Sequence, residues 1–144
     1  IPRAAFLDVE LKGDDHGAAT AAVLRSARGD APARAIVSSF DPASLVAMRE
    51  ALPGWPRWLN AEELAPATLS LALELGCVAV SAGWRAITPA AIRTANAAGL
   101  AVAAWTIRRR PTADRMERLG VIACCVEGAA LDAGPGGPVR ASRR

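Results

Sequence analysis

The chain has 144 residues, of which 52% are hydrophobic, and a formal net charge of +3. This length suits one globular domain, and the sequence has no run of about eighteen apolar residues that would span a membrane. The tail residues Arg140, Arg143 and Arg144 match the charge excess, and no basic stripe is interleaved with aromatic residues, so nucleic-acid binding is not favoured.

Short apolar stretches recur roughly every 20 to 29 residues, a repeat that suits successive strand–helix units. The predicted strands are 5–11, 34–39, 56–59, 77–81, 100–107 and 121–127. Between them lie alanine- and leucine-rich stretches that are typical of helices. Leu45, Met48 and Leu52 are spaced to form one buried face of such a helix.

Helix boundaries are marked by local signals. Asp41 before Pro42 and Thr88 before Pro89 each fit an N-cap followed by proline in the first turn. Glycines stand where helices should end with a left-handed residue, namely Gly29, Gly76, Gly99 and Gly120.

The order of elements predicts an α/β fold. Nearly continuous apolar strands such as 100–105 indicate a parallel sheet that is covered on both sides. Six successive units without a long break favour an incomplete (β/α)₈ TIM barrel over a doubly wound open sheet. Residues 1–132 are assigned to the barrel, and 133–144 are expected to be a disordered Pro/Gly/Arg tail.

The carboxyl ends of barrel strands carry the active site in this fold. Glu10 and Lys12 are two residues apart at one such end and so project to the same face. If that face is the barrel interior, the carboxylate suits a hard divalent cation and the ammonium suits a phosphate. The alternative is a solvated ion pair on an edge strand.

Other strand ends add polar and aromatic side chains. Ser38 and Ser39 either line the mouth or cap the strand end. Trp105 ends the most apolar strand and is either core or pocket wall. The remaining tryptophans also lie near loops, which suggests aromatic residues gathered at one end of the strands, and they are Trp55, Trp58 and Trp84.

His16, the only histidine, lies in a turn-like segment beside Asp14 and Asp15. A solvated loop histidine is the plainer interpretation, and a weak metal patch is the alternative. No Ser-His-Asp arrangement or nucleophile elbow is present. The three cysteines, Cys77, Cys124 and Cys125, are expected to be small buried residues without disulfides, the last two on opposite faces of a strand.

Several segments resemble the glycerophosphodiester phosphodiesterase family. Residues 7–12, LDVELK, resemble its N-I-E-I-K strand, and residues 37–45, VSSFDPASL, resemble its S-S-F-D-P-x-x-L segment. Residues 87–107 are similar to its L-T-P…G-L-x-V-x-x-W-T-V stretch. Residues 119–127 are similar to its closing G-V-D-G-I-I-T-D strand. The motif order holds over about residues 3–132.

The resemblance implies a metal-dependent hydrolase that converts glycerophosphodiesters to glycerol 3-phosphate and an alcohol, with Mg²⁺ or Ca²⁺ as the cofactor. It implies that Glu10 is a metal ligand, that Lys12 lies near the phosphate, and that Phe40 and Trp105 line the substrate pocket. The expected partner is a small-molecule diester, and the oligomeric state is left open. The sequence starts at Ile1 without a signal-peptide pattern, so localisation is open, with the cytoplasm slightly favoured.

The sequence also departs from the family. The H-R-G and H-D motifs and the E-x-D pair are not in this chain, so we expect no catalytic histidine here and little activity from the chain by itself. Arg108 replaces the usual asparagine, and Ile122 replaces an aspartate. A non-catalytic barrel, either a pseudoenzyme or a phosphate-binding module, is therefore the alternative, followed by an unrelated phosphate-handling barrel.

Overall fold

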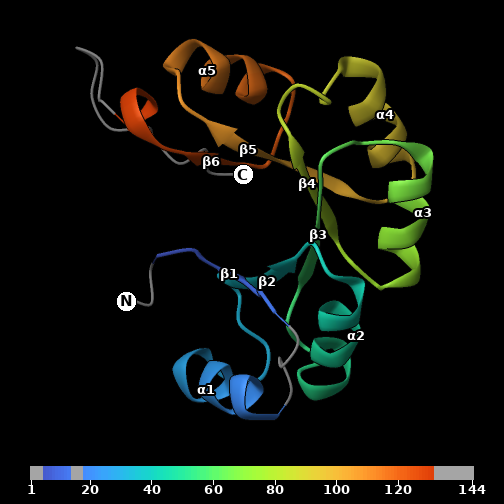
Figure 1. Cartoon of the computed structure of the whole chain (residues 1–144), viewed down its shortest axis with the longest axis vertical. Helices are drawn as coiled ribbons and strands as arrows, with labels where there is room; N and C mark the ends of the chain where they lie inside the picture. Colours follow the sequence, from blue (N-terminus) through green and yellow to red (C-terminus); the bar gives the residue numbers. More distant parts are fainter. Residues whose placement is uncertain (1–4, 14–17, 132–144) are drawn as a thin grey trace.

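A computed structural model describes residues 5–13 and 18–131, in which strands and helices alternate (Figure 1). The strands are β1 (Leu7–Glu10), β2 (Ala35–Ser39), β3 (Arg57–Ala61), β4 (Ala79–Gly83), β5 (Ala101–Ile107) and β6 (Ala123–Val126). The helices are α1 (Ala18–Arg28), α2 (Pro42–Ala51), α3 (Pro66–Glu74), α4 (Pro89–Ala97) and α5 (Arg110–Arg118), and a 3₁₀ turn (Gly128–Ala130) follows β6.

The strands form one parallel sheet in the order β1-β2-β3-β4-β5-β6, so each strand pairs with the next along the chain. Figure 1 shows the sheet curving into an arc, with the helices around its outer face and β1 and β6 on the two sides of the opening. Successive parallel strands with helices outside are the plan of a (β/α)₈ barrel. The described residues supply six of its eight strands, as the sequence predicted.

Successive side chains of each strand point alternately to the outer and the inner face of the sheet. Outward-facing residues such as Val80 and Val102 pack against helix residues such as Leu45 and Ile92 in the largest apolar cluster. The inward, concave face has a smaller cluster, which consists of Ile36, Trp58, Ala79 and Ala103. Most of the apolar burial therefore lies between sheet and helices.

The predicted helix boundaries are confirmed. The Asp41 carboxylate accepts hydrogen bonds from the N–H groups of Ala43 and Ser44, at 3.1 and 3.0 Å. Thr88 Oγ1 accepts one from Ala91 N–H at 3.1 Å. All four glycines expected at helix ends have φ between 66° and 86°, a region that suits a residue without Cβ.

Two predicted strands end too early. Strands expected at 56–59 and 77–81 span Arg57–Ala61 and Ala79–Gly83 instead. The prediction treated Asn60 as the polar end of its strand, whereas this side chain is buried within the sheet. A buried polar residue at the mouth of a barrel is therefore part of the strand and not its terminator.

The cysteine prediction is right in part. Cys77 is buried, and burial raises its pKa to about 11, but Cys124 is half-buried and Cys125 is exposed. Cys124 packs against the outer core, whereas Cys125 lies on the opposite face of β6. All three are free thiols, and no helix of the described residues is long and apolar enough to cross a membrane. Asp14, Asp15, His16 and the predicted tail lie outside the described residues.

Candidate functional site

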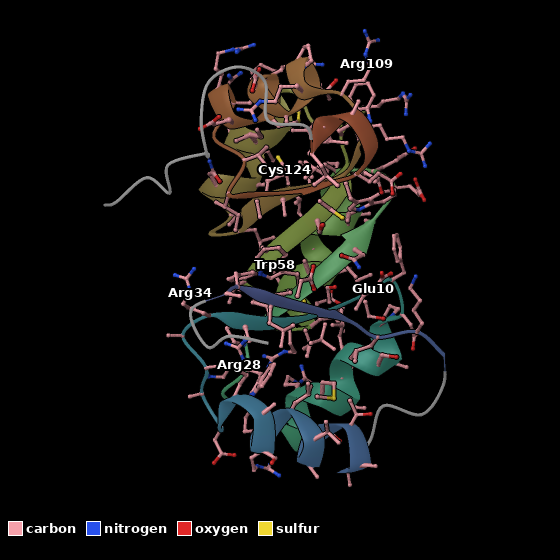
Figure 2. The ribbon with its side chains drawn as sticks, turned by 90° about the vertical axis from the view of Figure 1, so that its left-hand side faces the viewer. Glu10, Arg28, Arg34, Trp58, Arg109 and Cys124 are labelled. Carbon is pink, nitrogen blue, oxygen red and sulfur yellow. The ribbon has the colours of Figure 1, made fainter. Side chains whose placement is uncertain are left out.

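Parallel strands place all their carboxyl ends at one end of the sheet. Figure 2 shows Glu10, from the end of β1, on the same side of the molecule as Arg109, which follows β5. Arg34, just before β2, lies on the opposite side. The site residues expected from the sequence belong to the end marked by Glu10 and Arg109.

Glu10 and Lys12 form an ion pair at the end of β1, with 3.4 Å between Oε2 and Nζ. The Glu10 side chain is 37% exposed and that of Lys12 is 78% exposed. Such a solvated pair contributes about 0–1 kcal/mol to folding. The contact therefore does little for stability and leaves both charged groups accessible to a ligand.

A second carboxylate, that of Asp8, lies one step back on the same strand face as Glu10. Ser38 Oγ donates a hydrogen bond of 2.8 Å to Asp8 Oδ1. Desolvation raises the pKa of Asp8, the hydrogen bond from Ser38 lowers it by less, and the charge of Glu10 raises it further. This face of β1 is thus acidic, with Ser38 beside it on β2.

The neighbouring serine, Ser39, has a structural role. Ser39 Oγ donates to the carbonyl oxygen of Leu11 at 3.0 Å and accepts from Asp41 N–H at 3.0 Å. It therefore fixes the end of β2 to the segment after β1. Of the two alternatives from the sequence, Ser39 fits the strand-end cap and Ser38 fits the concave face.

Two aromatic residues meet across the strand ends. The Phe40 and Trp105 rings lie edge to face, with 5.4 Å between centroids and 72° between planes. Trp105 Nε1 donates to the carbonyl oxygen of Ser81 at 2.9 Å, which fixes the indole. Phe40 remains 48% exposed. The pair links the end of β2 to the end of β5.

A cavity of about 620 Å³ lies beside Trp105, at the ends of β3, β4 and β5. Its charged and aromatic lining residues are Glu62, Trp84, Arg85, Trp105, Arg108 and Arg109. Sequence reasoning missed Glu62, Arg85 and Arg109, and it treated Arg108 only as a departure from the family. The sequence signal that could have found them is the presence of arginines shortly after two predicted strands, in Trp84-Arg85 and in Arg108-Arg109-Arg110.

The expected site residues are only partly brought together. Strand register puts Glu10, Ser38 and Trp105 on the concave face of the sheet. The cavity, however, takes in Trp105 and neither Glu10 nor Lys12. Phe40, in contact with Trp105, lies outside its lining as well.

The idea that all four tryptophans gather at one end is wrong. Trp84 and Trp105 line the cavity, but Trp55 precedes β3 and Trp58 is near its start. Trp55 is buried and donates from Nε1 to the carbonyl oxygen of Gly29 at 2.8 Å. The error follows from the predicted end of β3, which put Trp58 at the wrong end of its strand.

The concave face also carries Cys125 of β6. Desolvation raises the pKa of this thiol, and the negative charges of Asp8, Glu127 and Glu10 raise it further. Glu127 forms an ion pair with Arg108. Among residues 5–13 and 18–131 no group of three or more His, Cys, Asp or Glu residues is arranged to hold a metal ion. A cation at Glu10 would therefore need residues from outside this part of the chain to complete its ligands.

Comparison with known proteins places these residues in a family. The sequence profile of the Glycerophosphoryl diester phosphodiesterase family matches residues 7–128. Comparison with curated proteins gives no match.

Solved structures share the fold. A phosphodiesterase from Oleispira antarctica, in complex with the product sn-glycerol-3-phosphate, superposes with a TM-score of 0.73 and 22% identity, covering 84% of this chain and 51% of that one. A glycerophosphodiester phosphodiesterase from Thermotoga maritima gives 0.65 and 16%, with 91% and 57% covered. One from Agrobacterium tumefaciens gives 0.69 and 16%, with 88% and 54% covered. The chain thus spans about half the length of these structures.

Proposed function

Because this chain belongs to the glycerophosphoryl diester phosphodiesterase family, we propose that the whole protein hydrolyses glycerophosphodiesters to glycerol 3-phosphate and an alcohol. The observation that carries the proposal is the accessible Glu10–Lys12 pair at the end of β1. It lies at the barrel end where catalytic groups of this fold are found.

In this proposal Glu10 supplies one carboxylate ligand to a divalent cation, Mg²⁺ or Ca²⁺. The exposed carboxylate has the hard oxygen donors that such cations take, but it is one ligand of several. The cation would supply Lewis acidity at the phosphate when bound. A complete set of ligands would need residues from outside the described part of the chain.

In the same proposal Lys12 attracts the phosphate. Its ammonium group is held within 3.4 Å of Glu10 and is otherwise in solvent, so it can contact an anion beside a cation held by Glu10. Phe40 and Trp105 would form the wall against which the substrate lies. Because the indole N–H is already bonded to Ser81, Trp105 offers its apolar surface.

Proton transfer needs groups that this sequence does not contain, because the family's paired histidines are not among its 144 residues. We therefore expect the chain by itself to release little or no glycerol 3-phosphate. The proposal concerns the whole protein.

The test is release of glycerol 3-phosphate from glycerophosphocholine and related diesters by the whole protein, with Mg²⁺ or Ca²⁺ and with EDTA. Glu10→Gln should lower kcat by about 100-fold or more, equal to about 2.7 kcal/mol of transition-state stabilisation. Glu50→Gln, which makes the same change on an exposed position of α2, is the matched control and should leave kcat unchanged.

Retained activity in Glu10→Gln would remove this residue from the site. Absence of metal-dependent release from every diester would refute hydrolysis. If the protein then still bound glycerol 3-phosphate, the non-catalytic phosphate-binding barrel would be the better description.

A further inference from the structure

The cavity beside Trp105 has an excess of positive charge. Its lining includes three arginines, Arg85, Arg108 and Arg109, and a single carboxylate, Glu62. Arg108 is ion-paired with Glu127. Within the part of the chain that the structure describes, Arg85 and Arg109 form no ion pair, so their charges remain to be balanced.

One of the two indoles in the cavity lining, that of Trp84, is already covered by a cation. The Arg85 guanidinium lies over the Trp84 ring, with Cζ 4.4 Å from the ring centroid. An aromatic cage for a quaternary ammonium group needs this face free. At Trp84 a cationic headgroup such as choline would therefore meet a covered ring and like charge, whereas an anion would meet guanidinium groups.

The loops that form the cavity are held together. Trp84 N–H donates to the carbonyl oxygen of Trp105 at 3.0 Å, which ties the end of β4 to β5. A Cβ at Gly83 would lie 3.1 Å from the Glu62 carbonyl oxygen, so the segment after β3 approaches the end of β4 closely. The arginines thus project from a fixed frame.

The position suits one arm of a diester. Trp105 is both a wall of the cavity and the ring partner of Phe40, which follows β2. A phosphate bound near Glu10 and Lys12 could extend one alcohol past this aromatic pair into the cavity. The volume of about 620 Å³ lies within the range of about 300–1,000 Å³ of small-molecule sites.

We propose that this cavity selects glycerophosphodiesters whose alcohol carries a second anionic group, a phosphate or a carboxylate, and that Arg85 and Arg109 are the residues that determine this specificity. The inference rests on the proposed hydrolysis and adds the class of substrate to it. A bidentate contact between a guanidinium and a phosphate would combine charge attraction with a defined hydrogen-bond geometry.

The experiment compares two diesters with the same glycerophosphate half. Glycerophosphocholine has a cationic alcohol, and bis(glycerophospho)glycerol has an alcohol that carries a second phosphate. The kcat/KM of the whole protein should be about tenfold higher for the anionic diester, with the difference mainly in KM. This preference should become smaller at higher salt concentration, because salt screens the charges.

The variant Arg85→Gln/Arg109→Gln should remove this preference by lowering kcat/KM for the anionic diester about tenfold more than for glycerophosphocholine. The matched control is Arg93→Gln/Arg118→Gln, which removes the same charge from exposed positions on α4 and α5 outside the cavity. It should keep the preference of the wild type.

Equal kcat/KM for the two diesters, a preference for choline, or the same loss in both double variants would overturn the inference while hydrolysis stands. If neither diester is hydrolysed, the proposed function fails, and the dissociation constants of the two diesters, measured by calorimetry in EDTA, decide the inference separately. Tighter binding of the anionic diester that is lost in Arg85→Gln/Arg109→Gln supports it, and equal binding contradicts it.

Discussion

The two faces of the sheet differ in chemistry, although alternate residues of the same strands form them. On the convex face, Val37 and Val80 are fully buried under helices. On the concave face, β1 presents the carboxylates of Asp8 and Glu10, and β6 presents the exposed Cys125. Figure 1 shows helices on the convex side only.

The convex face of the sheet mainly contributes to stability, and the concave face carries the groups suited to a functional site. Burial of apolar area against the helices is the main favourable contribution to folding. The concave face buries less and holds charged groups close together, which costs free energy and gives a site its chemistry. Substitutions on the convex face should therefore change stability, and those on the concave face should change titration and reactivity.

The largest effect should come from truncation on the convex face. Leu45→Ala removes a fully buried side chain from the main cluster and should lower the free energy of unfolding by about 3 kcal/mol. Phe40→Ala, directly after β2, should cost about 1 kcal/mol or less, because this side chain is already 48% exposed. Urea unfolding followed by circular dichroism measures both, and equal losses would contradict the assignment of stability to one face.

Arg57 is the one charged side chain that the described residues bury on the convex face. Its Nη1 and Nη2 donate at 3.0 Å to the carbonyl oxygens of Trp55 and Gly76, its Nε is buried without a partner, and desolvation lowers its pKa. Arg57→Ala should cost about 2 kcal/mol, because two hydrogen bonds to carbonyl oxygens are lost.

Arg57→Met should cost about 1 kcal/mol, since it keeps the apolar stem and removes the desolvated charge. Arg34→Met, at an exposed position at the same end of the sheet, is the control and should be neutral. A gain in stability for Arg57→Met, read from the same urea curves, would mean that desolvation outweighs the hydrogen bonds.

Local rules account for most of what the sequence predicted. Asp41 as an N-cap and Gly76 as a helix end depend on their immediate neighbours, and both are confirmed. The strand repeat and the motifs around Glu10 and Trp105 were enough for the fold and the family. Trp58 was misplaced because a buried polar residue, Asn60, continues its strand.

The cavity could not be predicted in the same way. Arg85 and Arg109 come together only because the loops after β4 and β5 meet, and no local pattern encodes that distance. The exposure of Cys125 is also a tertiary effect. Alternation predicts opposite faces for Cys124 and Cys125, but which of the two is covered depends on the helices, which lie on the outer face of the sheet.

On the concave face, Asp8→Asn should give a small, pH-dependent gain. Desolvation raises the pKa of Asp8 in the folded state, so the folded protein binds this proton more tightly than the unfolded chain. The stabilisation by the protonated form is lost as pH rises from the usual value of 3.8 through the raised pKa. At pH 7 the variant should be more stable by a few tenths of a kcal/mol, because solvent screens the charge.

The difference should vanish near pH 3, where Asp8 of the wild type is protonated, and urea unfolding at the two pH values measures it. In Ser38→Ala, which removes the hydrogen bond that lowers the pKa of Asp8, the gain from Asp8→Asn at pH 7 should be larger. A variant that is less stable at pH 7 and equal at pH 3 would mean that the hydrogen bond outweighs desolvation.

The smallest effect tests whether β1 and β6 face each other across the opening. The charges of Asp8 and Glu10 raise the pKa of the exposed Cys125 thiol, after desolvation, and so lower its thiolate fraction. Replacing Asp8 with Asn and Glu10 with Gln should therefore speed alkylation of Cys125 by the neutral reagent iodoacetamide about twofold at pH 7.5. The experiment uses a Cys124→Ser background, so that Cys125 is the thiol that reacts. Cys77 does not interfere, because it is buried.

The gain should shrink in about 1 M salt, where screening is nearly complete at these distances. Glu117→Gln, a change beside Cys124 on the outer side, is the control and should leave the rate unchanged. An unchanged rate in the Asp8/Glu10 variant would mean that Cys125 lies too far from β1 to sense its carboxylates. The arc would then be wider than a barrel that needs only two further strands, although strand register would still keep Glu10 and Trp105 on the same face of the sheet.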